Sequence, residues 1–142
     1  MKINILDITA QKLIKGSYQK ELPEFYNLKN YIENSLWHLN QSVFDHVVAV
    51  YSKAENIISN KSNNIDNYLS KHLGNQTRKA IYLLSVLLHD NAKDVTLVMS
   101  ETGIAGCPGH ELIGATRVWD YQARFKFDSD AMEAVERIVR YH

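Results

Sequence analysis

The sequence predicts a mostly α-helical protein with at most one short β-hairpin, and three observations support this fold class. Apolar side chains recur at helical intervals over residues 42–59, and residues 80–88 would be apolar on nearly every side of a helix. Only residues 95–107 have the pattern of two short strands joined by a turn. Both prolines, Pro23 and Pro108, stand where a helix would begin.

The first half of the chain is expected to contain two or three helices. Residues 22–39 predict one or two helices, the first beginning near Pro23. Residues 60–75 are polar and rich in asparagine, which predicts a loop with one short helical turn around Tyr68. Between them, residues 42–59 predict an amphipathic helix with its apolar side chains in one stripe: Val43, Val47, Val50, Tyr51, Ala54, Ile57 and Ile58.

The second half begins with the most apolar segment. Residues 76–90 predict a central buried helix, and a β-hairpin with Gly103 in its turn is expected to follow. Another helix is predicted within residues 109–125, after Pro108.

The last predicted helix is capped by Asp128 or Asp130, the second of which has capping-box spacing to Glu133. One face of this helix would collect Ala131, Val135, Ile138 and His142.

Length and charge restrict the class of protein. A chain of 142 residues can bury a sizeable core, so residues 1–142 are expected to form one domain. Basic and acidic residues both number 16, so no global positive field favours nucleic acid. An RNA-binding helical domain is therefore the weakest functional hypothesis, supported only by a local basic patch of Lys71, His72, Arg78 and Lys79.

The sequence also predicts a cytoplasmic protein with no membrane partner. Cys107 is the single cysteine, which excludes an internal disulfide framework and fits a reducing compartment. Because Asp7 and other polar residues interrupt the apolar N-terminal run, this run does not predict a signal peptide. No segment approaches the roughly 18 apolar residues of a membrane span. Cys107 has no close basic partner in the sequence, so we expect a structural residue rather than a nucleophile.

Three predicted helices each direct a histidine toward the interior. His46 lies on or beside the apolar stripe of residues 42–59, His89 ends the central helix next to Asp90, and His142 falls on the apolar face of the last helix. His38 and His72 are expected at the surface, with His38 able to rim a pocket.

A single inward histidine is usually a hydrogen-bonded core residue, but three inward histidines beside a carboxylate multiply the cost of burying polar groups. A metal ion would satisfy them together, and imidazole with carboxylate suits Zn, Fe, Ni, Co or Mn. Neighbours on a helix point about 100° apart. His89 and Asp90 can therefore converge on one ion only where the helix ends, as the sequence suggests at Asn91.

The segments "FDHVVAV", "LLHDNAKD" and "GCPGHELIGA" resemble the HD-domain metal-dependent phosphohydrolases, whose signature is H…HD…D. The likeness is greatest to the HD domain of CCA-adding and poly(A)-polymerase-type nucleotidyltransferases, and covers about residues 22–142. The matching positions are Trp37-His38, His46, His89-Asp90, Lys93, Gly109-His110-Glu111 and Gly114-Ala115. The Gly-Ser and paired-aspartate motif of the nucleotidyltransferase itself is absent, so the chain is not a CCA-adding enzyme.

The resemblance implies an HD-type helical bundle with His46, His89 and Asp90 as ligands of a divalent ion (Mn, Mg, Fe, Ni, Co or Zn). Members that hold two metals use further histidines, and His110 and His142 match those places. For His110 a helix-capping residue beside Pro108 is an equal alternative.

The resemblance further implies catalytic roles for Asp90 and Lys93, with Lys93 and His38 on the substrate side. Lys93 would neutralise phosphate charge. The alternative for Lys93 is an exposed lysine at a helix end, where the helix dipole stabilises a cation.

The family pattern ends with an aspartate on a later helix, and this chain stops at His142. We therefore expect a domain truncated at its C-terminus, or else a closing ligand among Asp120, Asp128 and Asp130.

Two functions follow from this pattern. The first is a metal-dependent phosphohydrolase that acts on a phosphomonoester or phosphodiester of a nucleotide or related molecule, with a metal-activated water as the nucleophile. The alternative is a non-catalytic HD-like module that binds a nucleotide or a protein partner, which the missing aspartate favours. The sequence does not indicate an oligomeric state, and fold alone does not decide between these functions.

Overall fold

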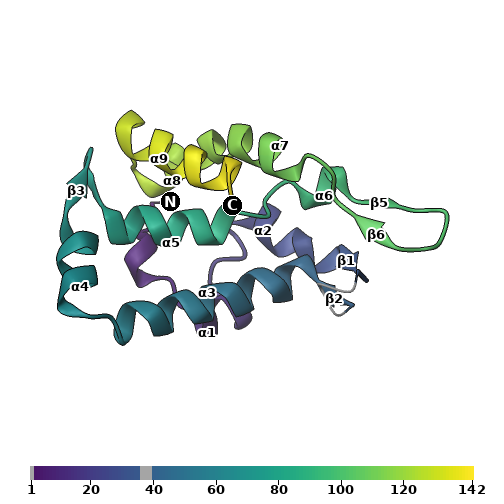
Figure 1. The fold of residues 1–142 in the computed structure, drawn as a ribbon, viewed down its shortest axis with the longest axis horizontal. Helices are drawn as coiled ribbons and strands as arrows, with labels where there is room; N and C mark the ends of the chain where they lie inside the picture. The colour runs from purple at the N-terminus through teal and green to yellow at the C-terminus, as the bar shows by residue number, and fades with distance from the viewer. Residues whose placement is uncertain (1, 36–39) are drawn as a thin grey trace.

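The structure, a computed structural model, describes residues 2–35 and 40–142, and its fold is mostly α-helical, as predicted. α5 lies between α3 on one side and α7 with α9 on the other (Figure 1). The elements are η1 (Ile5–Asp7), α1 (Ala10–Ile14), α2 (Pro23–Asn27), η2 (Leu28–Asn30), β1 (Ile32–Glu33), β2 (Gln41–Ser42), α3 (Val43–Ser59), α4 (Asn63–Ser70), β3 (His72–Leu73), β4 (Gln76–Thr77), α5 (Arg78–Leu88), α6 (Lys93–Thr96), β5 (Val98–Met99), β6 (Ala105–Gly106), α7 (His110–Arg117), η3 (Val118–Tyr121), α8 (Gln122–Phe125) and α9 (Ser129–Arg140).

α5 is the central buried helix that the apolar run predicts. The Thr77 side chain accepts a hydrogen bond from the Ala80 amide, which satisfies one free donor in the first turn. Residues on several sides of α5 are buried because the helix packs against both α3 and α9: Ala80, Ile81, Leu83, Leu84, Ser85, Leu87 and Leu88. The helix ends at His89, so the turn that follows projects from the middle layer of the fold.

α3 forms over the predicted residues, with Ser42 as its N-cap accepting from the Asp45 amide. Its stripe differs in detail from the prediction, because Ile57 is 55% exposed and Phe44 and Val48 are buried. α4 is longer than the single turn predicted around Tyr68 and has no buried residue.

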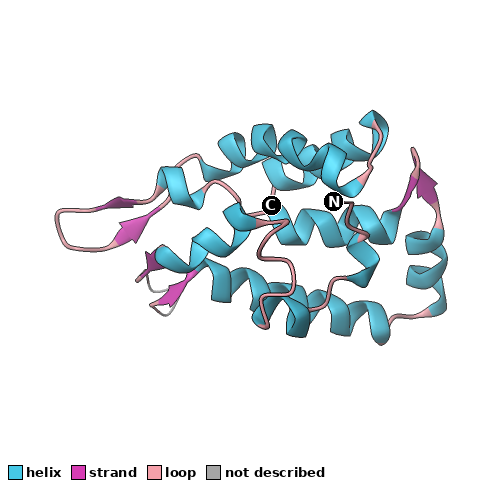
Figure 2. Ribbon diagram, turned by 180° about the vertical axis from the view of Figure 1, so that it is seen from behind, coloured by secondary structure: helices cyan, strands magenta, loops and turns pink. Residues whose placement is uncertain are grey.

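The fold has three two-stranded antiparallel hairpins in the described residues, so the prediction of at most one was wrong. The predicted hairpin is β5–β6, with Gly103 in its turn at a φ of 79°. β1 lies within residues 22–39, where one or two helices were predicted, and β3 lies at the end of the predicted loop, with β4 directly after it. Figure 2 shows strands only at the two ends of the molecule. Each ladder is two residues long, too short for an alternating apolar pattern to reveal it in the sequence.

α9 closes the fold over α5. Asp128 is its cap, accepting from the Ala131 amide, so the alternative cap Asp130 was wrong. Ile138, predicted on the inward face, is 43% exposed, and Val139 is buried instead. No helix among residues 2–35 and 40–142 has the length and apolar character needed to cross a membrane.

Gly114 on α7 lies against the turn that follows α5. The Asn91 side chain donates a hydrogen bond to the Gly114 carbonyl, and a β-carbon on Gly114 would lie 2.8 Å from Asn91 Oδ1. We expect Gly114→Ala to lower the free energy of unfolding by about 1 kcal/mol, because overpacking a buried contact outweighs the gain in helix propensity. Gly106→Ala is the matched control, since no heavy atom lies within 4 Å of its added β-carbon. Chemical denaturation measures both, and equal stability of the two variants would contradict this account of the α7 contact.

Candidate metal centre

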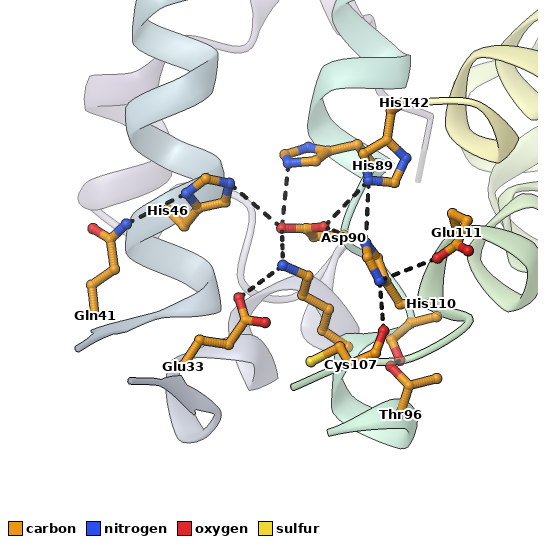
Figure 3. Close-up of polar contacts among 12 residues, drawn as sticks. Glu33, Gln41, His46, His89, Asp90, Thr96, Cys107, His110, Glu111 and His142 are labelled. Atoms are coloured by element: carbon orange, nitrogen blue, oxygen red, sulfur yellow. Dashed lines mark hydrogen bonds and ion pairs between the residues drawn. The ribbon is translucent and has the colours of Figure 1, made fainter. Parts of the chain in front are cut away.

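Four separate segments bring five ligand-type side chains to one place. α3 supplies His46, the end of α5 supplies His89 and Asp90, the first residue of α7 is His110, and His142 follows α9. Their side chains point toward a shared centre at the Asp90 carboxylate (Figure 3). Together with Lys93 these residues line an open pocket of about 320 Å³.

The two oxygens of Asp90 face different pairs of histidines. The Oδ2 atom lies 3.6 Å from His46 Nε2 and 3.3 Å from His89 Nε2. The Oδ1 atom lies 3.3 Å from His110 Nε2 and 3.6 Å from His142 Nε2. Two ligands bound about 2.1 Å from one ion at right or tetrahedral angles are themselves about 3.0–3.4 Å apart. Each half of the cluster therefore has spacings close to those of a metal site, and Asp90 belongs to both halves.

Three of the histidines are oriented as metal ligands usually are. The Nδ1 atoms of His89, His110 and His142 lie 2.6–2.7 Å from the carbonyl oxygens of residues 86, 107 and 139. A carbonyl oxygen cannot donate, so in each contact Nδ1 carries the hydrogen. In the neutral ring this leaves a lone pair on Nε2, directed at Asp90. This is the arrangement in which backbone carbonyls orient imidazole ligands around a metal.

Lone pairs also face one another within the cluster. His110 Nε2 and His142 Nε2 are 3.2 Å apart, and neither can donate when its ring is neutral with Nδ1 protonated. Asp90 Oδ2 is buried and accepts no hydrogen bond of good geometry from the described residues, although three nitrogen atoms lie within 3.6 Å. A divalent cation bound between these atoms would satisfy the lone pairs of the whole set at once. The donor set therefore fits one or two divalent ions.

The surrounding imidazoles shift the pKa of the Asp90 carboxyl. Burial of Asp90 opposes its ionisation, but the close imidazoles of His110, His142 and His89 outweigh burial and hold the pKa of the carboxyl well below its usual range. The hydrogen bond to Asp90 also raises the pKa of His142 above its ordinary value, against the opposing effect of burial. A metal ion at these nitrogens would displace that proton.

Lys93 is buried, with a side chain only 4% exposed, so the exposed-lysine alternative was wrong. Its Nζ atom lies 3.0 Å from Asp90 Oδ2 and 2.8 Å from Glu33 Oε2. Burial would lower the pKa of this ammonium, but the charge of Asp90 and the hydrogen bond to Glu33 outweigh it and raise the pKa. Lys93 therefore stays charged at the wall of the pocket.

Comparison with models of known protein families, with curated proteins and with solved structures found no match for this chain. The HD-domain resemblance therefore stays a prediction. The functional proposal rests on the geometry of the side chains.

The structure gathers most of the predicted site residues and leaves others out. His46, His89, Asp90, Lys93, His110 and His142 line the one pocket described above. The helix-capping alternative for His110 was wrong, because Gly109 is the N-cap of α7 and the His110 ring contacts Asp90. His38 lies outside the described residues.

The aspartates considered as a closing ligand do not join the cluster. Asp128 caps α9, while Asp120 and Asp130 are exposed. None of them belongs to the groups that could hold an ion together in the described part of the chain.

Burial raises the pKa of the Cys107 thiol to about 12, so this thiol is a poor nucleophile at neutral pH. This property fits the structural role predicted for Cys107.

Glu33 is the residue next to this site that the sequence did not reveal. It falls in a segment predicted to be helical, 60 positions before its partner Lys93, so no local spacing connects the two. A single glutamate that belongs to no periodic pattern is not recognisable from the sequence as a site residue. The pairing of β1 with β2 and the hydrogen bonds of Asn34 to the β5–β6 hairpin place its carboxylate beside the cluster.

Proposed function

We propose that the chain is a divalent-metal-dependent phosphohydrolase that acts on a phosphomonoester or phosphodiester of a nucleotide or related small molecule. The observation that carries the proposal is the orientation of the histidine rings. Three rings use Nδ1 on backbone carbonyls and direct Nε2 at one buried carboxylate. Four histidines and one aspartate form a donor set suited to Mn, Fe, Co, Ni or Zn, with Mg a weaker fit because it prefers oxygen ligands.

A metal bound at this centre would lower the pKa of a coordinated water and polarise a phosphoryl oxygen. Asp90 supplies negative charge to both halves of the cluster, so two neighbouring cations can share one carboxylate. Each histidine pair fixes one side of that carboxylate and leaves the open side of the pocket for substrate. A metal site that is open to substrate on one side is typical of catalysis, whereas structural metal sites are closed by protein ligands.

Lys93 contributes a fixed positive charge at the pocket wall. Its carboxylate partners hold the ammonium in place, so little conformational freedom is lost when a phosphate oxygen approaches. Phosphoester hydrolysis develops negative charge on the transferred group, and a preorganised cation stabilises that charge. A metal centre with an adjacent lysine therefore suits phosphoesters better than neutral substrates.

The test is hydrolysis by the purified, metal-stripped chain. p-Nitrophenyl phosphate, bis-p-nitrophenyl phosphate and nucleoside monophosphates are assayed with Mn²⁺, Mg²⁺, Co²⁺, Ni²⁺, Zn²⁺ or Fe²⁺. We expect turnover that depends on added metal and is lost in His46→Ala. His72→Ala is the matched control, because His72 is exposed on β3.

Hydrolysis that persists unchanged in His46→Ala would show that the activity belongs to another site or a contaminant. Tight metal binding without turnover on any ester would replace the proposed enzyme by the binding module.

A further inference from the structure

Glu33 is a buried carboxylate beside the metal centre and is not one of the candidate metal ligands. The residue is 4% exposed and lies on β1, whose partner strand β2 leads directly into α3. Its Oε2 atom is 2.8 Å from Lys93 Nζ. The same ammonium is 3.0 Å from Asp90 Oδ2, so two buried carboxylates share one lysine.

The position of this lysine creates a conflict for metal binding. Asp90 Oδ2 is the oxygen that faces His46 and His89, and a cation held by these three atoms would lie close to the Lys93 ammonium. Two positive charges at such a separation repel strongly in a partly buried site. A negative charge on the far side of the ammonium reduces this repulsion, and Glu33 provides it.

The backbone around Glu33 is anchored on the neighbouring hairpin. The Asn34 side chain donates to the Gly103 carbonyl at 2.8 Å and accepts from the Ala105 amide at 2.7 Å. These contacts fix the carboxylate on the Lys93 side of the pocket.

We infer that Glu33 is a positioning residue for the metal centre. It holds the Lys93 ammonium and reduces its repulsion of a bound cation, which leaves Asp90 Oδ2 available to a divalent cation. The inference rests on the metal binding in the proposed function and deepens it, because it assigns a role to a residue that touches neither metal nor substrate. If this role is right, the effect of substituting Glu33 on metal affinity depends on whether Lys93 is present.

The experiment is a titration of the metal-stripped chain with Mn²⁺, followed by the electron paramagnetic resonance signal of the free ion. Glu33→Gln should weaken Mn²⁺ binding by roughly 10- to 100-fold, as loss of outer-shell partners does at other metal sites. Lys93→Met should bind Mn²⁺ more tightly than the unmodified chain, because a competing cation is gone. The double variant removes both charges and should return to within a few-fold of the unmodified chain.

Glu24→Gln is the matched control, since it also removes one carboxylate from an ion pair, here with Arg124, which is not a residue of the metal centre. It should leave Mn²⁺ affinity unchanged. If Glu33→Gln binds Mn²⁺ as tightly as the unmodified chain, the inference is wrong while the proposed function stands. If the unmodified chain binds neither Mn²⁺ nor any other of the divalent ions assayed for hydrolysis, the proposed function itself fails.

Should Glu33→Gln not fold, the other two variants still decide. A Lys93→Met chain that binds Mn²⁺ no more tightly than the unmodified one would overturn the inference.

Discussion

Asp90→Asn is expected to lower the affinity of the chain for divalent cations by more than about 100-fold, beyond the loss typical of outer-shell substitutions. The carboxylate is the one anionic group shared by both halves of the cluster described above. An amide keeps the shape of the side chain but removes the charge, and amide nitrogen is not a metal ligand at neutral pH. Isothermal titration with Mn²⁺ and Zn²⁺ measures the loss. Metal-dependent phosphoester hydrolysis should disappear with it.

Asp90→Asn also distinguishes a loss of metal binding from a loss of folding, because the variant is expected to fold at neutral pH. Because the pKa of Asp90 is depressed in the folded chain, its ionisation adds stability above the ordinary aspartate pKa, and this contribution is lost as pH falls below about 4. Asp90→Asn should lack this acid-dependent component and still fold at neutral pH, where Lys93 keeps Glu33 as a partner. An Asp90→Asn chain that binds Mn²⁺ with unchanged affinity would contradict the assignment of Asp90 as the central ligand.

The second prediction with a large expected effect is the number of metal ions that each chain binds. Since each Asp90 oxygen faces its own histidine pair, we expect two Mn²⁺ ions per chain at saturation. His46→Ala should lose one ion and retain the other, and His142→Ala should do the same for the opposite half. His72→Ala should keep both, because that side chain is exposed and lies on β3.

Elemental analysis after equilibrium dialysis counts the ions. If His46→Ala and His142→Ala each abolish all binding, the four histidines serve a single ion, and the two-ion arrangement is wrong.

Much of this centre is accessible from the sequence because its ligands lie on helices or directly after them. The apolar stripe of α3 places His46 at the edge of the core, and the abrupt end of α5 places His89 beside Asp90. Helical periodicity is a local property, so a single sequence shows it without knowledge of the tertiary fold. The same periodicity predicted His142 on the inward face of the last helix. His142 instead follows α9 and is an exposed residue whose ring reaches Asp90, and Ile138 on that predicted face is exposed.

The parts that the sequence did not reveal depend on contacts between distant segments. β1 pairs with β2 across residues 34–40, and this pairing, rather than any helical pattern, turns Glu33 toward Lys93. The loop prediction for residues 60–75 missed β3–β4 and most of α4 because no side chain of α4 is buried, so no apolar stripe marks the helix. Short ladders and solvent-exposed helices leave weak local signals, and tertiary packing decides them.

The most direct measurement of the central claim is anomalous X-ray diffraction at the manganese absorption edge, from crystals of the chain grown with Mn²⁺. The account predicts an anomalous peak bonded to His46 Nε2, His89 Nε2 and Asp90 Oδ2, and a second peak beside Asp90 Oδ1, His110 Nε2 and His142 Nε2. The histidine Nδ1 atoms should remain on the carbonyl oxygens of residues 86, 107 and 139. Crystals saturated with Mn²⁺ that show no anomalous peak within bonding distance of Asp90 would contradict the claim that this cluster is a metal centre.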